Sequence, residues 1–423
     1  MLVYSVMPNQ NLVLTFIISS LLFASCEAVA QGHFSDPVDP ESVGMSSDSL
    51  QSMDDYFHQL VDTEQLAGIQ TAVIRKGQLV HFDSYGYGNI AESSPITDQS
   101  IFRIFSMTKP IVSVALMQLF ENGHFKLEDP IHKYLPEFKD LTIYTDSALI
   151  PAKEPIQIID LLRHTSGYSY GRSAYPELNQ IYASANLYAS ENIWEFAQKA
   201  SQLPLQFEPG SDWQYGISTN LCGYLIEVLS GQSLDAYLQT HIFDPLGMED
   251  THFQIPEEKI DRFTVGYGWQ EENGLTIVEE QRDNRYVREV TLLNGGGGLV
   301  STTYDYMHFC QMLLNGGVLR GHRILKAETI DLMLQDHLQE ARASQEQLRL
   351  PPGELGFGLG FAVRGNEAQE FEQVFGWGGA VGTYFKIDPK NELAYVMMIQ
   401  LSPYRHLGLR QRLQDFVEAA IID

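Results

Sequence analysis

The chain has 423 residues, 44% of them hydrophobic, so it is long enough for one large bilobal unit or for two to three average domains. It carries 54 acidic and 27 basic residues, a formal net charge of −27 and a sequence pI near 4.7. This balance argues against nucleic acid as a partner, because phosphate binding requires clustered lysine and arginine. It indicates a solubilising acidic surface instead.

The first 30 residues are predicted to be a signal peptide. Residues 12–24 form a mostly apolar run that is too short to span a bilayer, and Ala28-Val29-Ala30 supplies an A-x-A cleavage pattern before Gln31. No Lys or Arg precedes Arg75, so only the α-amino group gives this segment a positive charge. The alternative is a lipoprotein anchored through Cys26. Either route predicts an exported protein, periplasmic or secreted, with residues 31–423 as the working domain.

The predicted elements begin with a helix at residues 47–61 and a hairpin with strands at 69–75 and 79–84 around Lys76-Gly77. A helical apolar pattern then runs to residue 120. Residues 131–289 show mostly helical patterns with long polar loops, and the clearer helices are at 156–163, 190–200 and 220–229. The glycine run 295–298 is interpreted as a flexible turn into a β-rich part with strands at 359–363, 371–375, 381–387 and 393–400, before a final helix at 406–421.

The early and late strands are therefore predicted to share one sheet. The fold class is α+β, with an antiparallel sheet flanked by helices in a lobe of about 31–130 and 290–423, and an inserted helical lobe of about 131–289. Cys222 and Cys310 fall within helical apolar patterns, which predicts buried free thiols rather than a disulfide. No cluster of Cys and His has the spacing of a metal site.

Ser106-Met107-Thr108-Lys109 is an S-x-x-K box at the expected start of a helix. If Ser106 opens that helix, Lys109 lies one turn further along on the same face. Serine is a weak nucleophile that needs a neighbour to take its proton, and a desolvated lysine can accept it. The box alone is weak evidence, because it arises often by chance on exposed helices.

Further motifs around this box carry a resemblance to a known family. They are, in chain order, 101–109 around the box, Leu161-Leu162-Arg163-His164-Thr165-Ser166-Gly167, Pro209-Gly210-Ser211-Asp212-Trp213-Gln214-Tyr215, Gly298-Leu299-Val300-Ser301-Thr302 and Phe375-Gly376-Trp377-Gly378-Gly379. With these the chain resembles the penicillin-recognising serine hydrolases of the class C β-lactamase fold, and most closely the family VIII carboxylesterases. The resemblance covers nearly everything after residue 40.

The resemblance implies catalytic roles for Ser106, Lys109 and Tyr215, with Tyr215 acting as a phenolate-like base beside the serine and lysine. It also implies an oxyanion hole formed by the backbone N–H groups of Ser106 and Ala380. It implies no metal and no cofactor.

Two departures from the β-lactamase pattern bear on the substrate. Ile217 stands where β-lactamases have the Asn of a Tyr-x-Asn motif, and Trp377-Gly378-Gly379 replaces their lysine-threonine-glycine strand. The indole of Trp377 offers an apolar wall in place of a cation, and Gly378 and Gly379 are expected to let substrate approach the strand backbone. Both departures favour small-molecule esters over β-lactams.

The sequence thus predicts a carboxylesterase that cleaves short-chain esters through a Ser106 acyl-enzyme. A β-lactamase, a D-amino-acid peptidase or an acyltransferase on the same fold remain alternatives, and a non-catalytic penicillin-binding module is the alternative outside enzymes. Gly167-Tyr168-Ser169-Tyr170-Gly171 also matches the G-x-S-x-G nucleophile elbow, but that elbow must follow a buried strand and open a helix, and the pattern here predicts neither. His164 is interpreted as a structural histidine rather than a member of a triad.

Overall fold

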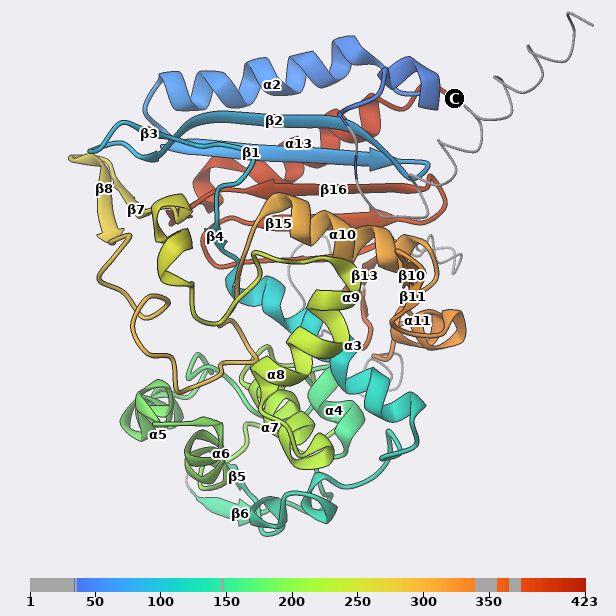
Figure 1. Ribbon diagram of the computed structural model, residues 1–423. Helices are drawn as coiled ribbons and strands as arrows, with labels where there is room; N and C mark the ends of the chain where they lie inside the picture. The colour runs from blue at the N-terminus through green and yellow to red at the C-terminus, as the bar shows by residue number, and fades with distance from the viewer. Residues whose placement is uncertain (1–33, 35, 146–147, 339–355, 365–373) are drawn as a thin grey trace, which may run out of the picture.

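A computed structural model describes residues 34, 36–145, 148–338, 356–364 and 374–423 (Figure 1). The predicted signal peptide, its cleavage site and Cys26 lie outside the described residues, as does the first part of the strand predicted at 371–375. Within the described ranges, no helix is long and apolar enough to cross a membrane. Cys222 and Cys310 are buried and free, as predicted.

Among the described residues the main sheet has eight strands, and every pairing within it is antiparallel. Early and late segments meet at its centre, where Val73 lies opposite Tyr395. In sheet order the strands are β12 (Gly356–Phe357), β13 (Ala362–Arg364), β14 (Val374–Gly378), β15 (Tyr384–Asp388), β16 (Leu393–Met398), β1 (Gly68–Arg75), β2 (Gln78–Asn89) and β3 (Ser94–Pro95).

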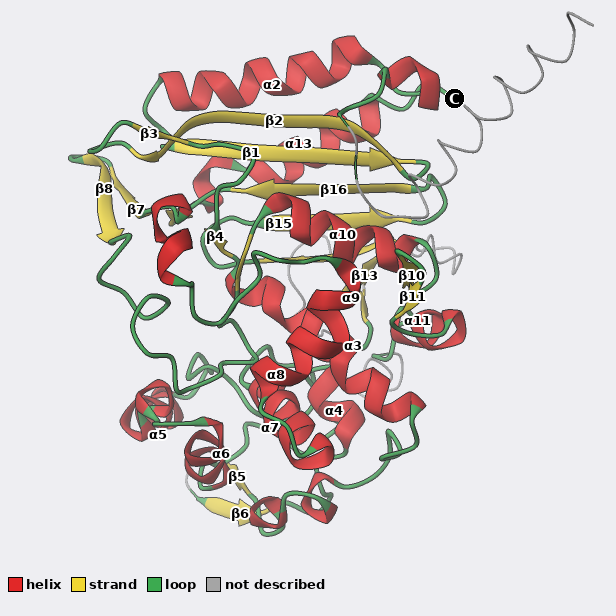
Figure 2. Cartoon of the chain, viewed as in Figure 1, coloured by secondary structure: helices red, strands yellow, loops and turns green. Residues whose placement is uncertain are grey.

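Helices cover both faces of this sheet, which explains why every residue of β1 is buried. Successive side chains alternate between the faces: Val73 packs in the core formed with the terminal helices α2 and α13, and Ala72 and Ile74 pack in the larger core on the other face. Figure 2 shows α2 and α13 on the first side, with α10 and the remaining helices on the second.

The helices begin and end as follows. They are α2 (Ser47–Asp62), α3 (Thr108–Glu121), α4 (Ile158–Leu162), α5 (Pro176–Ala185), α6 (Ile193–Ser201), α7 (Ser218–Ser230), α8 (Leu234–Leu238), α9 (Asp244–Leu246), α10 (Thr303–Leu314), α11 (Ala327–Met333) and α13 (Leu409–Ala419). The helix α3 packs against α7 and is buried along most of its length, which fits its apolar sequence.

The described part of the chain also contains four small sheets. They pair β4 (Phe102–Arg103) with β9 (Val300–Ser301), β5 (Thr142–Tyr144) with β6 (Leu149–Pro151), β10 (Val318–Leu319) with β11 (His322–Arg323), and β7 (Gly266–Gln270) with β8 (Gly274–Glu279) and β17 (Leu401–Ser402).

The helix α10, capped by the Thr302 side chain, contains Cys310 and confirms the helical pattern expected around that residue. The structure differs from the sequence-based expectation in two other segments. The strands β7 and β8 lie within the segment predicted to be mostly helical. The strand predicted at 359–363 begins only at Ala362, because residues 358–361 form a bend that returns from β12.

Candidate active site

The S-x-x-K box lies in the connection from β4 to α3. Ser106 was expected to open the helix, but it sits in a single 3-10 turn, η2 (Phe105–Met107), and α3 begins at Thr108. Such turns are frequent at helix N-termini. Phe105 has a φ of 42°, a conformation that is costly for a residue other than glycine and that clusters at functional sites. The Ser106 side chain is half-buried, so the turn leaves it within reach of a substrate.

The segment before this turn is fixed by the fully buried Arg103. Its guanidinium forms an ion pair with Glu279, at 2.8 Å, and donates to the carbonyl oxygens of Thr264 and Glu280 at 2.6 and 3.0 Å. Buried charges are tolerated only when they are paired and hydrogen-bonded in this way. Arg103 therefore ties the strand that leads to Ser106 to the segment around β7 and β8.

Lys109 is held at the base of the site with only 1% of its surface exposed. Its Nζ lies 3.3 Å from Ser106 Oγ and donates to the carbonyl oxygen of Gly296 at 2.5 Å. The same Nζ lies 4.7 Å from the centre of the Tyr215 ring. The lysine thus contacts both other residues of the predicted catalytic set.

The glycine run is part of the site, which sequence reasoning missed by treating it as a flexible turn. A side chain at Gly296 would overlap the amide oxygen of Asn220, and one at Gly295 would come within 2.9 Å of the Thr219 carbonyl oxygen at the start of α7. Asn294 accepts hydrogen bonds from Asn220 and from the Gly296 N–H at 2.7 and 3.0 Å. The close packing directs the Gly296 carbonyl at Lys109. Four glycines directly after an asparagine were the available signal.

Tyr215 is half-buried just before α7 and sits among aromatic rings. Trp377 Nε1 donates to the Tyr215 hydroxyl oxygen at 3.2 Å, with ring centres 5.2 Å apart. Tyr170 packs edge-on against Tyr215 at 5.5 Å and also lies 5.4 Å from Lys109 Nζ. Tyr170 belongs to the G-x-S-x-G match, and sequence reasoning did not assign it to the site.

Gly378, Gly379 and Ala380 follow Trp377 at the end of β14, which contacts η2. A side chain at Gly378 would overlap the guanidinium of Arg410, and a Cβ at Gly379 would lie 2.6 Å from the carbonyl oxygen of Ile104. Contacts within the protein thus disfavour a side chain at either position, and the approach of substrate to the two glycines stays a prediction. Ala380 is exposed. The structure places this turn beside the segment that carries Ser106.

His164 lies behind Tyr215, with ring centres 4.9 Å apart, and is 1% exposed. Burial, together with the nearby Lys109 ammonium, holds the pKa of His164 well below its ordinary value, so the imidazole is neutral. Its role here is to pack against Tyr215.

Ser169 is fully buried, and its hydroxyl accepts a hydrogen bond from the Gly171 N–H at 3.0 Å. The residues on either side of it form neither a strand nor the start of a helix. Ser169 therefore lacks both the exposure and the setting of a nucleophile elbow.

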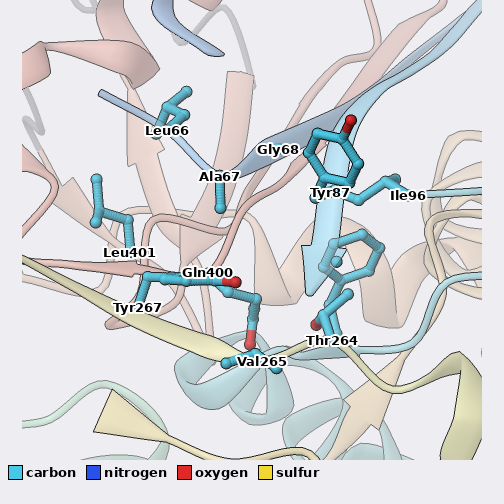
Figure 3. Close-up of a pocket in the computed structure, with 12 residues that line it drawn as sticks. Leu66, Ala67, Gly68, Tyr87, Ile96, Thr264, Val265, Tyr267, Gln400 and Leu401 are labelled. Atoms are coloured by element: carbon cyan, nitrogen blue, oxygen red, sulfur yellow. The ribbon is translucent and has the colours of Figure 1, made fainter. Parts of the chain in front are cut away.

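A small cavity lies elsewhere, between β1, β2 and β7, and is lined by residues such as Gly68, Tyr87 and Tyr267 (Figure 3). Its volume of about 10 Å³ is enough for roughly one water molecule. None of the predicted site residues lines it, and its volume is too small for an ester substrate. Among the described residues, no group of three or more His, Cys, Asp or Glu side chains is arranged to hold a metal ion.

Comparison with known proteins adds independent evidence. The Beta-lactamase family model matches residues 53–417. Protein Rv1367c of Mycobacterium tuberculosis is 30% identical over 361 residues, covering 82% of this chain and 89% of that protein. Esterase EstB of Burkholderia gladioli is 31% identical over 237 residues, covering 54% of this chain and 58% of that protein.

The fold also matches a solved structure, that of EstCE1, described as a hydrolase with promiscuous acyltransferase activity. The two share 22% identity with a TM-score of 0.72, over 87% of this chain and 98% of that one. At this identity the match supports the α+β fold alone. Together with the family match over most of the sequence, it leads to one conclusion: the chain belongs to the Beta-lactamase family and is a serine hydrolase.

Proposed function

We propose that the protein is a carboxylesterase that hydrolyses short-chain esters through an acyl-enzyme on Ser106. One observation carries the proposal: the indole N–H of Trp377 donates to the hydroxyl oxygen of Tyr215, at the position where β-lactamases have a lysine. The site therefore has a neutral hydrogen-bond donor against its proposed base. An uncharged ester needs no cation at this position, whereas a β-lactam carboxylate does.

In the proposed reaction, Ser106 Oγ attacks the ester carbonyl as its proton passes to the Lys109–Tyr215 pair. The tetrahedral intermediate collapses when that pair returns a proton to the departing alcohol, leaving the acyl group on Ser106. Water then attacks the acyl-enzyme and gives a proton to the same pair, which passes it to Ser106 Oγ as the bond to the acyl group breaks and the acid is released. Lys109 can serve both steps because the Gly296 carbonyl holds its Nζ beside Ser106 Oγ.

The side chain at position 217 supports the same substrate class. Ile217 is 1% exposed and caps the start of α7 without offering a polar side-chain atom. It cannot provide the amide that holds the side chain of a β-lactam. A β-lactam carboxylate that enters the cleft would lose part of its hydration, and neither an amide nor a cation would compensate for that loss. Alcohols as acyl acceptors remain compatible with the proposal, because an alcohol can replace water in the second step.

The hydrogen bond from Trp377 gives a specific prediction. Trp377→Phe keeps an aromatic wall but removes the donor, so kcat for p-nitrophenyl butyrate is expected to fall about tenfold, the value of a hydrogen bond of about 1.4 kcal/mol. KM is expected to change by less than about threefold. Steady-state kinetics per titrated active site measures both quantities.

Trp213→Phe is the matched control. Trp213 is buried and also packs against Tyr215, with ring centres 6.3 Å apart, but its indole N–H has no hydrogen-bond partner among the described residues. Equal losses of kcat in the two variants would mean that aromatic packing, and not the donor, supports Tyr215.

A panel of p-nitrophenyl esters of rising acyl length, assayed beside a chromogenic cephalosporin, tests the proposed function as a whole. We expect the highest kcat/KM on short acyl chains. A higher kcat/KM on the cephalosporin would show that the enzyme is a β-lactamase and not an esterase.

Export is the second part of the proposal, and it rests on the N-terminal sequence. Mass spectrometry of the native protein is expected to find a mature start at Gln31, the residue after Ala28-Val29-Ala30. A start at Cys26 with a diacylglyceryl adduct would show that the protein is processed as a lipoprotein and is not cleaved after Ala30. An intact start at Met1 would reject export.

A further inference from the structure

The turn after β14 is closed by two backbone hydrogen bonds. The Gly379 N–H donates to the Thr383 carbonyl at 2.8 Å, and the Gly382 N–H donates to the Gly379 carbonyl at 3.3 Å. Both acceptor oxygens also bind one side chain, because Arg410 Nη2 donates to them at 2.7 Å (Gly379) and 3.1 Å (Thr383). A single guanidinium from α13 thus donates hydrogen bonds to both carbonyls that close the turn.

The guanidinium is itself fixed in place. Its central carbon lies 5.2 Å from the Tyr384 ring centre and 4.8 Å from that of Tyr404, and it fills the space where a side chain at Gly378 would stand. Arginine suits this position because its planar fork can stack on aromatic rings while donating hydrogen bonds in set directions.

The carbonyl of Gly379 and the N–H of Ala380 belong to the same peptide unit. In a trans peptide the two groups point in opposite directions, so holding the carbonyl toward α13 turns the Ala380 N–H away from it. On another side, Gly379 packs against the Ile104 carbonyl, two residues before Ser106. Within the described part of the chain, neither the Ala380 N–H nor the Ser106 N–H donates to another backbone carbonyl. No backbone acceptor among the described residues therefore competes with an oxyanion for either N–H.

We propose that Arg410 is a positioning residue, which orients the Gly379–Ala380 peptide so that its N–H is the second donor of the oxyanion hole. The inference rests on the proposed Ser106 acyl-enzyme and extends it to a residue that touches no substrate. Oxyanion donors act by being preorganised toward the charge that develops in the transition state. Losing such a donor outright costs about 10²–10³ in kcat, so loss of its orientation is expected to cost about ten- to thirtyfold.

The test uses the full mature chain with Arg410→Met and Arg410→Lys, and Arg412→Met as the matched control. Arg412 is an exposed arginine two residues further along α13 whose guanidinium lies near the Tyr56 ring, 5.8 Å from its centre. Active sites are counted with a fluorophosphonate, so a misfolded fraction does not enter the rates. The readouts are kcat and KM for p-nitrophenyl butyrate and the Ki of a trifluoromethyl ketone, whose adduct with serine places an oxyanion in the hole.

We expect Arg410→Met to lower kcat ten- to thirtyfold with KM nearly unchanged, and to raise the Ki of the trifluoromethyl ketone by a similar factor. Arg410→Lys, which keeps a cationic donor but not the planar fork, is expected to recover part of both losses, and Arg412→Met to match the wild type. An unchanged kcat and Ki in Arg410→Met would overturn the inference, as would a loss confined to KM or an equal loss in Arg412→Met. The ketone binds whether or not esters are the substrates, so poor ester turnover with an Arg410-dependent Ki would count against the proposed function alone.

Discussion

Replacing Ser106 with alanine is expected to lower kcat for p-nitrophenyl butyrate by about 10⁴-fold or more, the loss seen when a serine nucleophile is removed from a hydrolase. Ser169→Ala is expected to retain most of the activity. The difference follows from the two environments: Ser106 Oγ is half-buried beside Lys109 Nζ, whereas Ser169 is fully buried and its hydroxyl binds the backbone of its own loop.

The Ser106 variant should fold normally. Lys109 retains its hydrogen bond to the Gly296 carbonyl when the serine hydroxyl is removed, so its buried Nζ keeps a partner. Circular dichroism and thermal unfolding of both variants provide the control. Wild-type turnover in a folded Ser106→Ala protein would reject the mechanism, and inactivity of Ser169→Ala alone would move the nucleophile to the G-x-S-x-G match.

The second large effect concerns substrate class. The kcat/KM for p-nitrophenyl butyrate is expected to exceed that for nitrocefin by at least about a hundredfold. The site offers Ile217 and Trp377 where β-lactamases have an amide and a cation, and a charge left unmatched in the cleft costs on the order of a few kcal/mol. About 3 kcal/mol corresponds to roughly two decades in rate.

Both substrates are measured with one preparation whose active sites have been titrated, so that the ratio does not depend on the active fraction. Ser106→Ala serves as the blank for non-enzymatic hydrolysis of the activated ester. Comparable efficiencies on the two substrates would show that the interpretation of Ile217 and Trp377 is wrong.

The parts of the site that could be predicted from sequence are those with local spacing or a side-chain signature. Lys109 follows Ser106 by three residues, and helical geometry alone brings the two together. Tyr215 and Trp377 are far from that box in sequence, so only the resemblance to a family pointed to them. The structure brings both to the same place and adds a hydrogen bond between them.

The parts that could not be predicted depend on the backbone or on long-range packing. The partner of Lys109 is the carbonyl of Gly296, which has no side chain to mark it. Arg410 on the terminal helix α13 donates a hydrogen bond to the Gly379 carbonyl in the turn after β14. No sequence pattern within either element predicts this contact. Trp377 was expected to be an apolar wall. Its hydrogen bond to Tyr215 could not be predicted, because residue type does not reveal where an indole N–H points.

The fold shows the same division. The helix α3 and the central strands β1 and β16 were predicted because their apolar patterns are long and periodic. The helix α10 was predicted only as a helical pattern around Cys310; its start is set by the Thr302 side chain, which accepts a hydrogen bond from the Asp305 N–H. The short strands β12 and β13 are set by pairing with neighbours rather than by their own composition.

Trapping the acyl-enzyme tests the central claim most directly. The protein is mixed with p-nitrophenyl butyrate, quenched in acid within the first turnovers, digested and mapped by mass spectrometry. The account predicts a butyryl adduct on the peptide that contains Ser106 and no such adduct in Ser106→Ala. An adduct on the peptide that contains Ser169, or ester turnover without any serine adduct, would contradict it.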